Sequence, residues 1–298
     1  MIKYNSPFIS SNRQPFQTLP LIIQMALIED NAFNDITSDL TIDEFSICAF
    51  QINARQDLVF CGKKIVEEVF LQLKKSKKFA DCEIKYNFLV DDGEIVKKSQ
   101  NIVEGHGSDK LVLVAERLIL NLVQHLSAIA TTTHKFVKKL NNPRIKILDT
   151  RKTLPNLREL QKYGVLCGGG YNHRFSLADL ILIKDNHINA CKGVENAMQK
   201  VCNLALEQKI EIECDNLIQV GQVLKFKPNI IMLDNMEIAE IEESIELIRK
   251  NSPQTLIEVS GGINIENIEK YSTLDIDFIS IGSLTNSCQN IDIGLDFL

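Results

Sequence analysis

The sequence predicts an α/β protein in which an N-terminal α+β sandwich domain is followed by an incomplete (β/α) barrel of six to seven parallel strands. Two observations carry this prediction. Before residue 114 the apolar pattern mixes helical and extended stretches, which is typical of a compact domain with antiparallel pairing. After residue 144 short β-branched runs alternate with amphipathic helices, which is typical of parallel strands buried on both faces. An open, doubly wound parallel sheet is the alternative for the second part.

The first part of the chain contains two expected helices, over 21–28 and 64–74, because apolar residues recur there at helical spacing. The stretches expected to be extended are 45–60, 83–90 and 110–114. Asp92-Gly93 lies between extended segments, and this dipeptide predicts a hairpin turn.

A long helix over 116–140 is expected to lead into the barrel, with Arg117 on its polar stripe. The expected barrel strands are 145–148, 180–183, 210–212, 230–233, 256–259 and 278–281, and a further short strand is expected around 165–167. Helices over 194–207 and 237–250 separate some of these strands. A strand–helix alternation of this kind favours a parallel sheet.

The composition is that of a globular protein with a sizeable core: 45% of residues are hydrophobic, 24% are charged, and the net charge is −6. An acidic chain of this kind is not expected to bind nucleic acid. We also expect no membrane span and a cytoplasmic location, because the N-terminus is mostly polar and no run of about 18 apolar residues stands out. The eight cysteines form no CxxC pair, so we expect free thiols.

Charged residues or glycines follow every expected barrel strand. These residues are Asp149 to Lys152, Lys184 to His187, Glu213, Asp234-Asn235, Ser260-Gly261-Gly262 and Gly282-Ser283. In a parallel barrel the C-terminal ends of the strands share one face, and that face holds the active site. The sequence therefore predicts one site built from six strand ends.

The two last strand ends are the expected phosphate site, formed by Ser260, Gly261, Gly262 and Gly282. Glycines let backbone N–H groups approach a phosphate closely, and the loops after the last barrel strands often bind one. The alternative is that these glycines only form tight turns with positive φ.

Glu213 and Asp234 end neighbouring strands and are the expected metal ligands. Two carboxylates without a histidine or cysteine partner suit Mg²⁺, which prefers oxygen and often bridges protein and substrate phosphates. An ion pair with Lys184 and general acid–base work are the alternatives.

A cationic cluster is expected beside these acids, formed by Arg151, Lys152, His173, Arg174 and Lys184. Between residues 144 and 187 eight basic residues stand against four acidic ones, in an otherwise acidic chain. Arginine is favoured for carboxylates because its planar fork donates two parallel hydrogen bonds. These residues therefore predict a site for anionic substrates, although a solvated charged face is the common explanation of such a run.

With these residues assembled, the chain resembles the quinolinate phosphoribosyltransferase family, also called carboxylating nicotinate-nucleotide pyrophosphorylases. The matching stretches are Glu29-Asp30 through Asp35-Ile36-Thr37, ERLILNLVQHLSAIATTT, ILDTRKTLPNLR, CGGGYNHR, LILIKDNHI, IEIECDNL, IIMLDNM, IEVSGGINIENI and FISIGSLTNS. They run in family order and cover nearly the whole chain. Ala32, Asn34, Ala128 and Asn286 depart from the family pattern, and none of these positions is an expected ligand.

The resemblance implies a TIM-like barrel over 114–284, a first domain over 1–113 and a tail, 285–298, that returns to the first domain. It implies transfer of phosphoribose from phosphoribosyl pyrophosphate to quinolinate, with Mg²⁺ and loss of CO₂, in de novo NAD biosynthesis. The implied catalytic residues are Lys152, Lys184, Glu213 and Asp234, and the implied substrate-binding residues are Arg117, Arg151, Lys152, His173, Arg174, Lys184, Ser260, Gly261, Gly262 and Gly282. It also implies a homodimer in which the helix around Arg117 reaches the partner's barrel, giving shared active sites.

Three other functions are the alternatives. The nearest is a paralogous phosphoribosyltransferase that acts on nicotinate or another aromatic acid. A phosphate-handling barrel isomerase or lyase explains the glycine turns but not the cations from Arg151 to Arg174. A homologue that only binds a metabolite is expected to have lost Glu213, Asp234 or Lys184, and all three are present.

Overall fold

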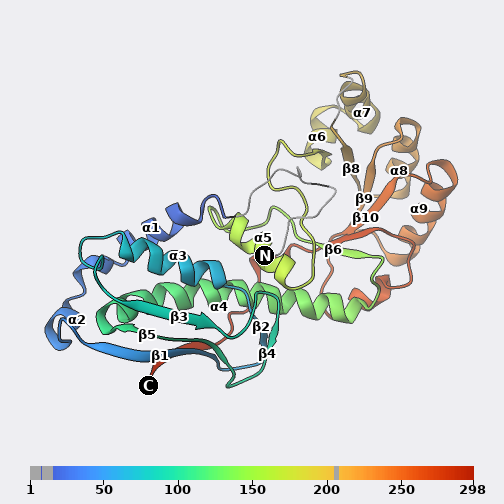
Figure 1. Cartoon of the computed structure of the whole chain (residues 1–298). Helices are drawn as coiled ribbons and strands as arrows, with labels where there is room; N and C mark the ends of the chain where they lie inside the picture. Colours follow the sequence, from blue (N-terminus) through green and yellow to red (C-terminus); the bar gives the residue numbers. More distant parts are fainter. Residues whose placement is uncertain (1–7, 9–15, 205–207) are drawn as a thin grey trace.

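The computed structural model describes residue 8, residues 16–204 and residues 208–298. Its first domain is a two-layer α/β sandwich, in which a four-stranded antiparallel sheet of order β12-β1-β5-β3 is covered on one face by helices (Figure 1). The strands are β1 (Ile47–Ala54), β3 (Ile84–Phe88), β5 (Asn101–Ser108) and β12 (Ile293–Phe297), and β2 (Leu58–Val59) pairs with β4 (Ile95–Val96) in a small second sheet. The helices are α1 (Leu19–Glu29), α2 (Ile36–Thr41) and α3 (Lys63–Lys74).

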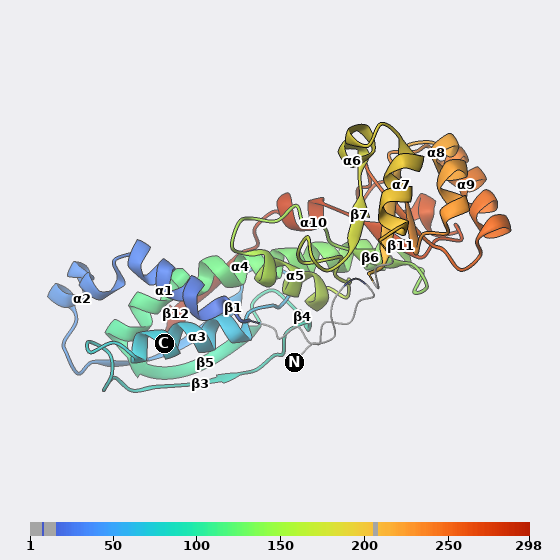
Figure 2. The same cartoon turned by 90° about the horizontal axis from the view of Figure 1, so that it is seen from above.

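The longest helix, α4 (Asp109–Leu140), joins the two parts of the molecule (Figure 2). Its first half packs into the core of the sandwich through residues such as Leu111 and Ile119, and its second half packs into the barrel core through Phe136 and Leu140. By length and composition α4 is apolar enough to cross a membrane, but 61% of its most apolar window is buried inside the protein. Packing between two cores therefore accounts for its apolar composition.

The second domain is an incomplete barrel of parallel strands, as predicted. Six strands pair in the order β6-β11-β10-β9-β8-β7. They are β6 (Lys146–Leu148), β7 (Ile181–Ile183), β8 (Ile210–Cys214), β9 (Ile230–Asp234), β10 (Leu256–Ser260) and β11 (Phe278–Ser280). Tyr171 adds a single parallel bridge to Leu148, so the barrel stays open between the Tyr171 segment and β7.

Helices surround this sheet: α5 (Arg158–Cys167), α6 (Asp185–Ala190), α7 (Val194–Cys202), α8 (Leu217–Val223), α9 (Ile238–Asn251) and α10 (Ser283–Asn286). Phe8 is buried among Leu148, Leu180, Ile230 and Phe278. Ile230 and Phe278 begin their strands and Leu148 ends its strand, so Phe8 lies inside the barrel, where its ring stacks on that of His173 with the ring centres 4.3 Å apart.

The C-terminal segment returns to the first domain, where β12 lies antiparallel to β1 with Phe50 opposite Phe297. The expected domain boundary at 113/114 falls inside α4, a helix that contributes side chains to both cores.

Three local predictions were wrong, and one strand was missed. Residues 110–114 do not form a strand but belong to α4, which begins seven residues before the predicted start at 116. The strand that precedes them, β5, was not predicted. Residues 165–167 lie in helix α5. The single extended stretch predicted over 45–60 is two strands, β1 and β2, which belong to different sheets.

Two further predictions need correction in detail. Asp92-Gly93 does form a turn, with Gly93 at a φ of 92°, but it does not close a hairpin, because β3 pairs with β5 whereas β4 pairs with β2. The helix predicted over 194–207 ends at Cys202, and residues 205–207 lie outside the described part of the chain.

Candidate active site

A cleft of about 390 Å³ opens at the C-terminal end of the barrel strands. Its lining residues are Thr150, Arg151, Lys152, His173, Arg174, Leu182, Lys184, Glu213, Met232, Asp234, Ser260 and Ser280. Eight of these residues were expected to form the site. They are Arg151, Lys152, His173, Arg174, Lys184, Glu213, Asp234 and Ser260. Parallel strands thus bring these distant residues to one cavity.

Arg151 lies in the turn after β6 with an unsatisfied hydrogen-bond donor. Its Nε is buried and has no hydrogen-bond partner among the described residues. Burial and the nearby Arg151 guanidinium lower the pKa of Arg174, which donates from Nη1 to the carbonyl of Leu180 at 3.1 Å. An orphaned donor beside a second guanidinium is suited to an anionic ligand, because a carboxylate satisfies the donor and offsets the repulsion.

Lys152 and Lys184 extend the positive lining on two sides of the cleft. The backbone carbonyl of Lys152 accepts a hydrogen bond from Thr285 Oγ1 at 2.7 Å, which ties this turn to α10. Lys184 stands at the end of β7, and its ammonium pairs with the carboxylate of Glu213 on the next strand. Both ammonium groups therefore belong to one cleft with the acids.

The acids of the cleft are Glu213 on β8 and Asp234 on β9, and the exposed Asp215 lies beside them. Oxygen atoms of the three carboxylates lie within 4.8 Å of one another. Burial raises the pKa of Glu213, and the Asp234 carboxylate adds to this rise, while Lys184 opposes it. Only oxygen ligands are offered here, which is the ligand set of Mg²⁺.

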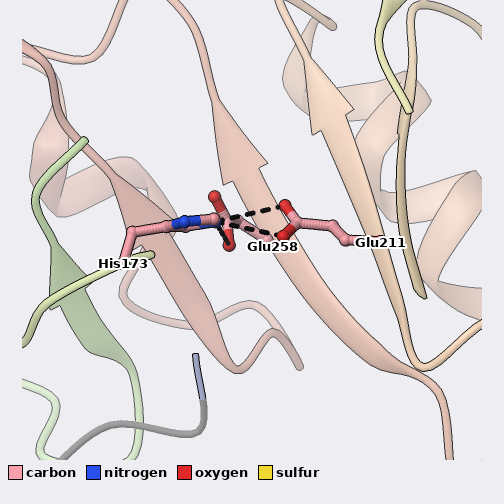
Figure 3. A group of neighbouring side chains, drawn as sticks. All are labelled: His173, Glu211 and Glu258. Carbon is pink, nitrogen blue, oxygen red and sulfur yellow. Dashed lines mark hydrogen bonds and ion pairs between the residues drawn. The ribbon is translucent and has the colours of Figure 1, made fainter. Parts of the chain in front are cut away.

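His173 lines the cleft but directs both ring nitrogens toward protein partners. Its Nε2 lies 3.1 Å from the Glu211 carboxylate and 3.5 Å from that of Glu258, and both acids are fully buried inside the barrel (Figure 3). Its Nδ1 accepts the backbone N–H of Arg174 at 2.8 Å. The substrate-binding role expected for His173 stays a prediction, and neither nitrogen is free for it in this arrangement.

His173, Glu211 and Glu258 also have the spacing of a metal site, with ligand atoms within 4.8 Å of one another. The ring tautomer argues against a metal. Because Nδ1 accepts an N–H, the ring proton lies on Nε2, the nitrogen that faces the two carboxylates. A histidine that ligates a metal instead donates from its second nitrogen.

The glycines expected to hold a phosphate have different environments. Gly261 and Gly262 have φ values of 88° and 63°, so the tight-turn explanation applies to both. A Cβ on Gly261 would lie 2.2 Å from Asn235 Oδ1, which excludes any larger residue there. A Cβ on Gly282 would lie 3.0 Å from the Lys152 side chain. Ser260 lines the cleft, and a phosphate at these turns stays a prediction.

Sequence reasoning missed four residues at this end of the barrel: Leu182, Met232 and Ser280 in the lining, and Asp215 beside the acids. Thr150 belonged to an expected strand end but was given no role. Ser280 is the most informative, because its buried Oγ has no hydrogen-bond partner among the described residues. The predicted strand over 278–281 contains it, and alternation along that strand was the signal that would have pointed it into the barrel.

Arg117 is not part of the cleft. It lies in helix α4 of the first domain, with 63% of its side chain exposed, and contacts Glu116 at 3.8 Å. It lines a separate hollow with residues of the first domain: Asp30, Asn31, Ala32, Asn34, Asp35, Leu113 and Val114. Within one chain, the structure therefore does not bring Arg117 together with the other expected ligands.

The sequence profile of the quinolinate phosphoribosyl transferase C-terminal domain matches residues 129–296, and that of the N-terminal domain matches residues 35–127. The chain belongs to this family. A probable nicotinate-nucleotide pyrophosphorylase (carboxylating) of Methanocaldococcus jannaschii is 40% identical over 284 residues, covering 93% of this chain and 96% of that protein. The enzyme of the same name from Mycobacterium leprae is 37% identical, covering 92% of this chain and 95% of that protein.

Solved structures of quinolinate phosphoribosyltransferase family members share the fold. The nicotinate-nucleotide pyrophosphorylase of Ehrlichia chaffeensis superposes with a TM-score of 0.86 at 40% identity, covering 93% of this chain and 98% of that one. That of Francisella tularensis gives a TM-score of 0.87 at 36% identity, covering 96% and 98%. The two-domain architecture described above is therefore that of the family.

Proposed function

We propose that this quinolinate phosphoribosyltransferase family member transfers phosphoribose from phosphoribosyl pyrophosphate to quinolinate and releases CO₂, giving nicotinate mononucleotide and pyrophosphate. The observation that carries the proposal is the buried Nε of Arg151, which has no hydrogen-bond partner within the described part of the chain, in a cleft that Lys152, Arg174 and Lys184 also line. Quinolinate brings two carboxylates and phosphoribosyl pyrophosphate brings several phosphates. A low-dielectric cleft strengthens the attraction between these anions and the cations.

The proposed chemistry needs no nucleophile from the protein. As the bond from the anomeric carbon to pyrophosphate breaks, positive charge develops on the ribose, and the carboxylates of Glu213 and Asp234 stabilise it. The pyridine nitrogen, oriented by Arg151 and Arg174, donates its electron pair to the anomeric carbon. The ring nitrogen is then quaternary and withdraws electrons, so the adjacent carboxylate leaves as CO₂ and the ring carbon takes up a proton.

Glu213 and Asp234 are also the residues that we propose to hold Mg²⁺, with Asp215 close enough to contribute. The donor set fits the ion, since every group is a carboxylate and the oxygens converge. When bound, Mg²⁺ neutralises charge on the leaving pyrophosphate. Lys184 already pairs with Glu213 and opposes the rise in the pKa of this carboxylate that burial and Asp234 cause.

The direct test is an assay of the purified protein with Mg²⁺ and phosphoribosyl pyrophosphate, offered either quinolinate or nicotinate. We expect stoichiometric CO₂ and nicotinate mononucleotide from quinolinate, because a second carboxylate is needed to use both guanidinium groups. Faster mononucleotide formation from nicotinate than from quinolinate would instead support the paralogous enzyme. If neither quinolinate nor nicotinate is consumed, the remaining hypothesis is a protein that binds a metabolite without catalysis.

We further propose a homodimer with shared active sites, in which Arg117 completes the cleft of the partner subunit. Arg117 is exposed and lies outside the cleft of its own chain. The neighbouring helix α2 packs against α4 and leaves Ile36 and Leu40 exposed at 74% and 86%, and Phe45 follows at 89%. Large exposed apolar side chains on the domain that carries this arginine are typical of an interface.

This arrangement predicts a complementation result. Arg117→Ala and Arg151→Ala chains, each inactive alone, should regain activity when mixed and allowed to exchange subunits, because a hybrid dimer contains one site with both arginines. Random pairing makes about half of the dimers hybrid, so roughly a quarter of wild-type activity is the upper limit. Activity is measured after mixing, with sedimentation to confirm the dimer. A mixture that stays as inactive as its components would exclude the shared site.

A further inference from the structure

A fully buried ion pair, formed by Asp149 and Lys162, lies beneath the cleft and lines no part of it. Asp149 ends β6, and its carboxylate accepts from the Lys162 ammonium, from Asn172 Nδ2 at 2.5 Å and from the backbone N–H of His173 at 2.9 Å. Both charged side chains have 0% exposure. Three donors from two other segments therefore converge on one carboxylate.

Lys162, in helix α5, binds the segment around His173 as well as Asp149. Its ammonium donates to the carbonyl of His173 at 2.9 Å and lies 4.9 Å from the centre of the Phe175 ring. Asn172 Nδ2 donates in turn to the carbonyl of Lys162 at 2.9 Å. The backbone of His173 is thus held at both its N–H and its C=O by one ion pair.

The segments held in this way carry the arginines of the cleft. Asp149 stands two residues before Arg151, and His173 is followed directly by Arg174. The Arg174 N–H also donates to the His173 ring, so the backbone at 173–174 is fixed at consecutive groups. The ion pair therefore determines where the Arg151 turn lies relative to the Arg174 segment.

A contribution to folding stability does not by itself explain why Asp149 and Lys162 are both fully buried. Removing an ammonium and a carboxylate from water carries a large desolvation penalty, and well-packed apolar replacements of a buried pair are often neutral or stabilising. What an apolar pair cannot do is fix the direction of two backbone groups through hydrogen bonds. A role in positioning is therefore the better account of the pair.

We propose that Asp149 and Lys162 are positioning residues that set the spacing of Arg151 and Arg174 and so select a pyridine acid with two adjacent carboxylates. The inference rests on the proposed function, because quinolinate is the acid concerned. Neither residue touches the substrate. Both act through the backbone of the segments that bear the two arginines.

The test begins with Lys162→Met, which keeps an unbranched side chain but removes the ammonium. We expect KM for quinolinate to rise about 100-fold, since a displacement near 1 Å is enough for such a loss. KM for phosphoribosyl pyrophosphate should change by less than about threefold, because the phosphate site expected at Ser260, Gly261, Gly262 and Gly282 follows β10 and β11, which this ion pair does not hold. A merely structural role would lower the amount of folded protein without separating the two KM values.

The double variant Asp149→Asn/Lys162→Met separates positioning from stability. It leaves no unpaired buried charge, and the asparagine carbonyl still accepts from His173, so Tm should return toward the wild-type value. KM for quinolinate should stay high because the carbonyl of His173 has lost its donor. Recovery of KM together with Tm would overturn the proposal, as would a normal KM in either variant. Should Lys162→Met fail to fold, the double variant alone decides.

Ile241→Ala is the matched control. Ile241 is fully buried in α9, belongs to the barrel core and does not line the cleft. Its truncation should lower Tm as a core cavity does and leave both KM values unchanged. The wild-type protein is measured alongside. Absence of quinolinate turnover in the wild type would refute the proposed function, whereas a normal wild type with unaffected variants would refute only this inference.

Discussion

Replacing Arg151 with alanine is expected to reduce kcat/KM for quinolinate by roughly 10³-fold or more. Charge-assisted hydrogen bonds contribute about 1.5–3 kcal/mol each, and a bidentate guanidinium makes two of them with one carboxylate. The buried Nε of Arg151 has no hydrogen-bond partner among the described residues, so little within the protein competes for it. Steady-state kinetics with quinolinate varied at saturating phosphoribosyl pyrophosphate measure the loss.

Two further variants bracket that result. Arg151→Lys keeps the charge but not the planar fork, so an intermediate loss is expected. Arg144→Ala removes an exposed arginine that precedes β6, at the other end of the same strand, and should leave the kinetics unchanged. Near-normal quinolinate turnover by Arg151→Ala would exclude a carboxylate-binding role for this residue.

The second large effect is expected from Glu213→Gln, with kcat/KM falling by about 10²–10³-fold. Losing one preorganised electrostatic contact to a transition state commonly costs about 2.7–4 kcal/mol. The glutamine is neutral, so it neither stabilises positive charge on the ribose nor balances Lys184, the present partner of Glu213. The concentration of Mg²⁺ that gives half-maximal activity should rise as well, and calorimetric titration with Mg²⁺ and pyrophosphate measures the same ligand loss without turnover.

Glu237→Gln provides the comparison for this variant. Glu237 is an exposed acid that directly precedes α9 and does not line the cleft. The same chemical change there should alter neither the rate nor the Mg²⁺ requirement. An unchanged Mg²⁺ requirement in Glu213→Gln would remove this residue from the proposed metal ligands and leave it only a role beside the ribose.

The barrel and its cleft were predictable because their signal is local and repeated. Each barrel strand is a short β-branched run whose end carries a charge or a glycine, and parallel pairing alone places those ends together. Glu213 and Asp234 illustrate this: each lies at the C-terminal end of a predicted strand, β8 or β9, so their proximity could be predicted without knowledge of their contacts. The fold class and the grouping of most cleft residues therefore follow from pattern and topology.

The errors arose where tertiary packing overrides the local pattern. β5 contains Gly105 and Gly107, and glycine is a poor strand residue. Both are needed for close packing, because a Cβ on Gly105 would lie 2.6 Å from the Phe50 ring and a Cβ on Gly107 would lie 2.5 Å from the Glu83 carbonyl. Residues 110–114 are rich in leucine and valine, yet they pack as a helix because Leu111 and Val112 are both fully buried in the sandwich core. Neither close approach nor burial is visible in the sequence.

The buried polar groups were unpredictable for a related reason. Lys162 belongs to the basic run over 144–187, for which a solvated charged face was the common explanation, and only the residue after β6 supplies its carboxylate partner. His173 was likewise expected to bind substrate beside Arg174, but in the structure Glu211 on β8 and Glu258 on β10 face its ring (Figure 3). A long-range partner decides whether a charge points outward to a ligand or inward to the protein.

The pairing of β12 with β1 fixes an order of events during protein synthesis. Asn53 on β1 binds Asp296 across 243 residues of sequence, and all the barrel strands lie between them. The ribosome therefore releases the whole barrel before the sheet of the first domain can gain its last strand. Until then the edge of β1 offers unpaired backbone groups to any neighbouring chain. A nascent molecule is thus most exposed to mispairing while its catalytic half is still being made.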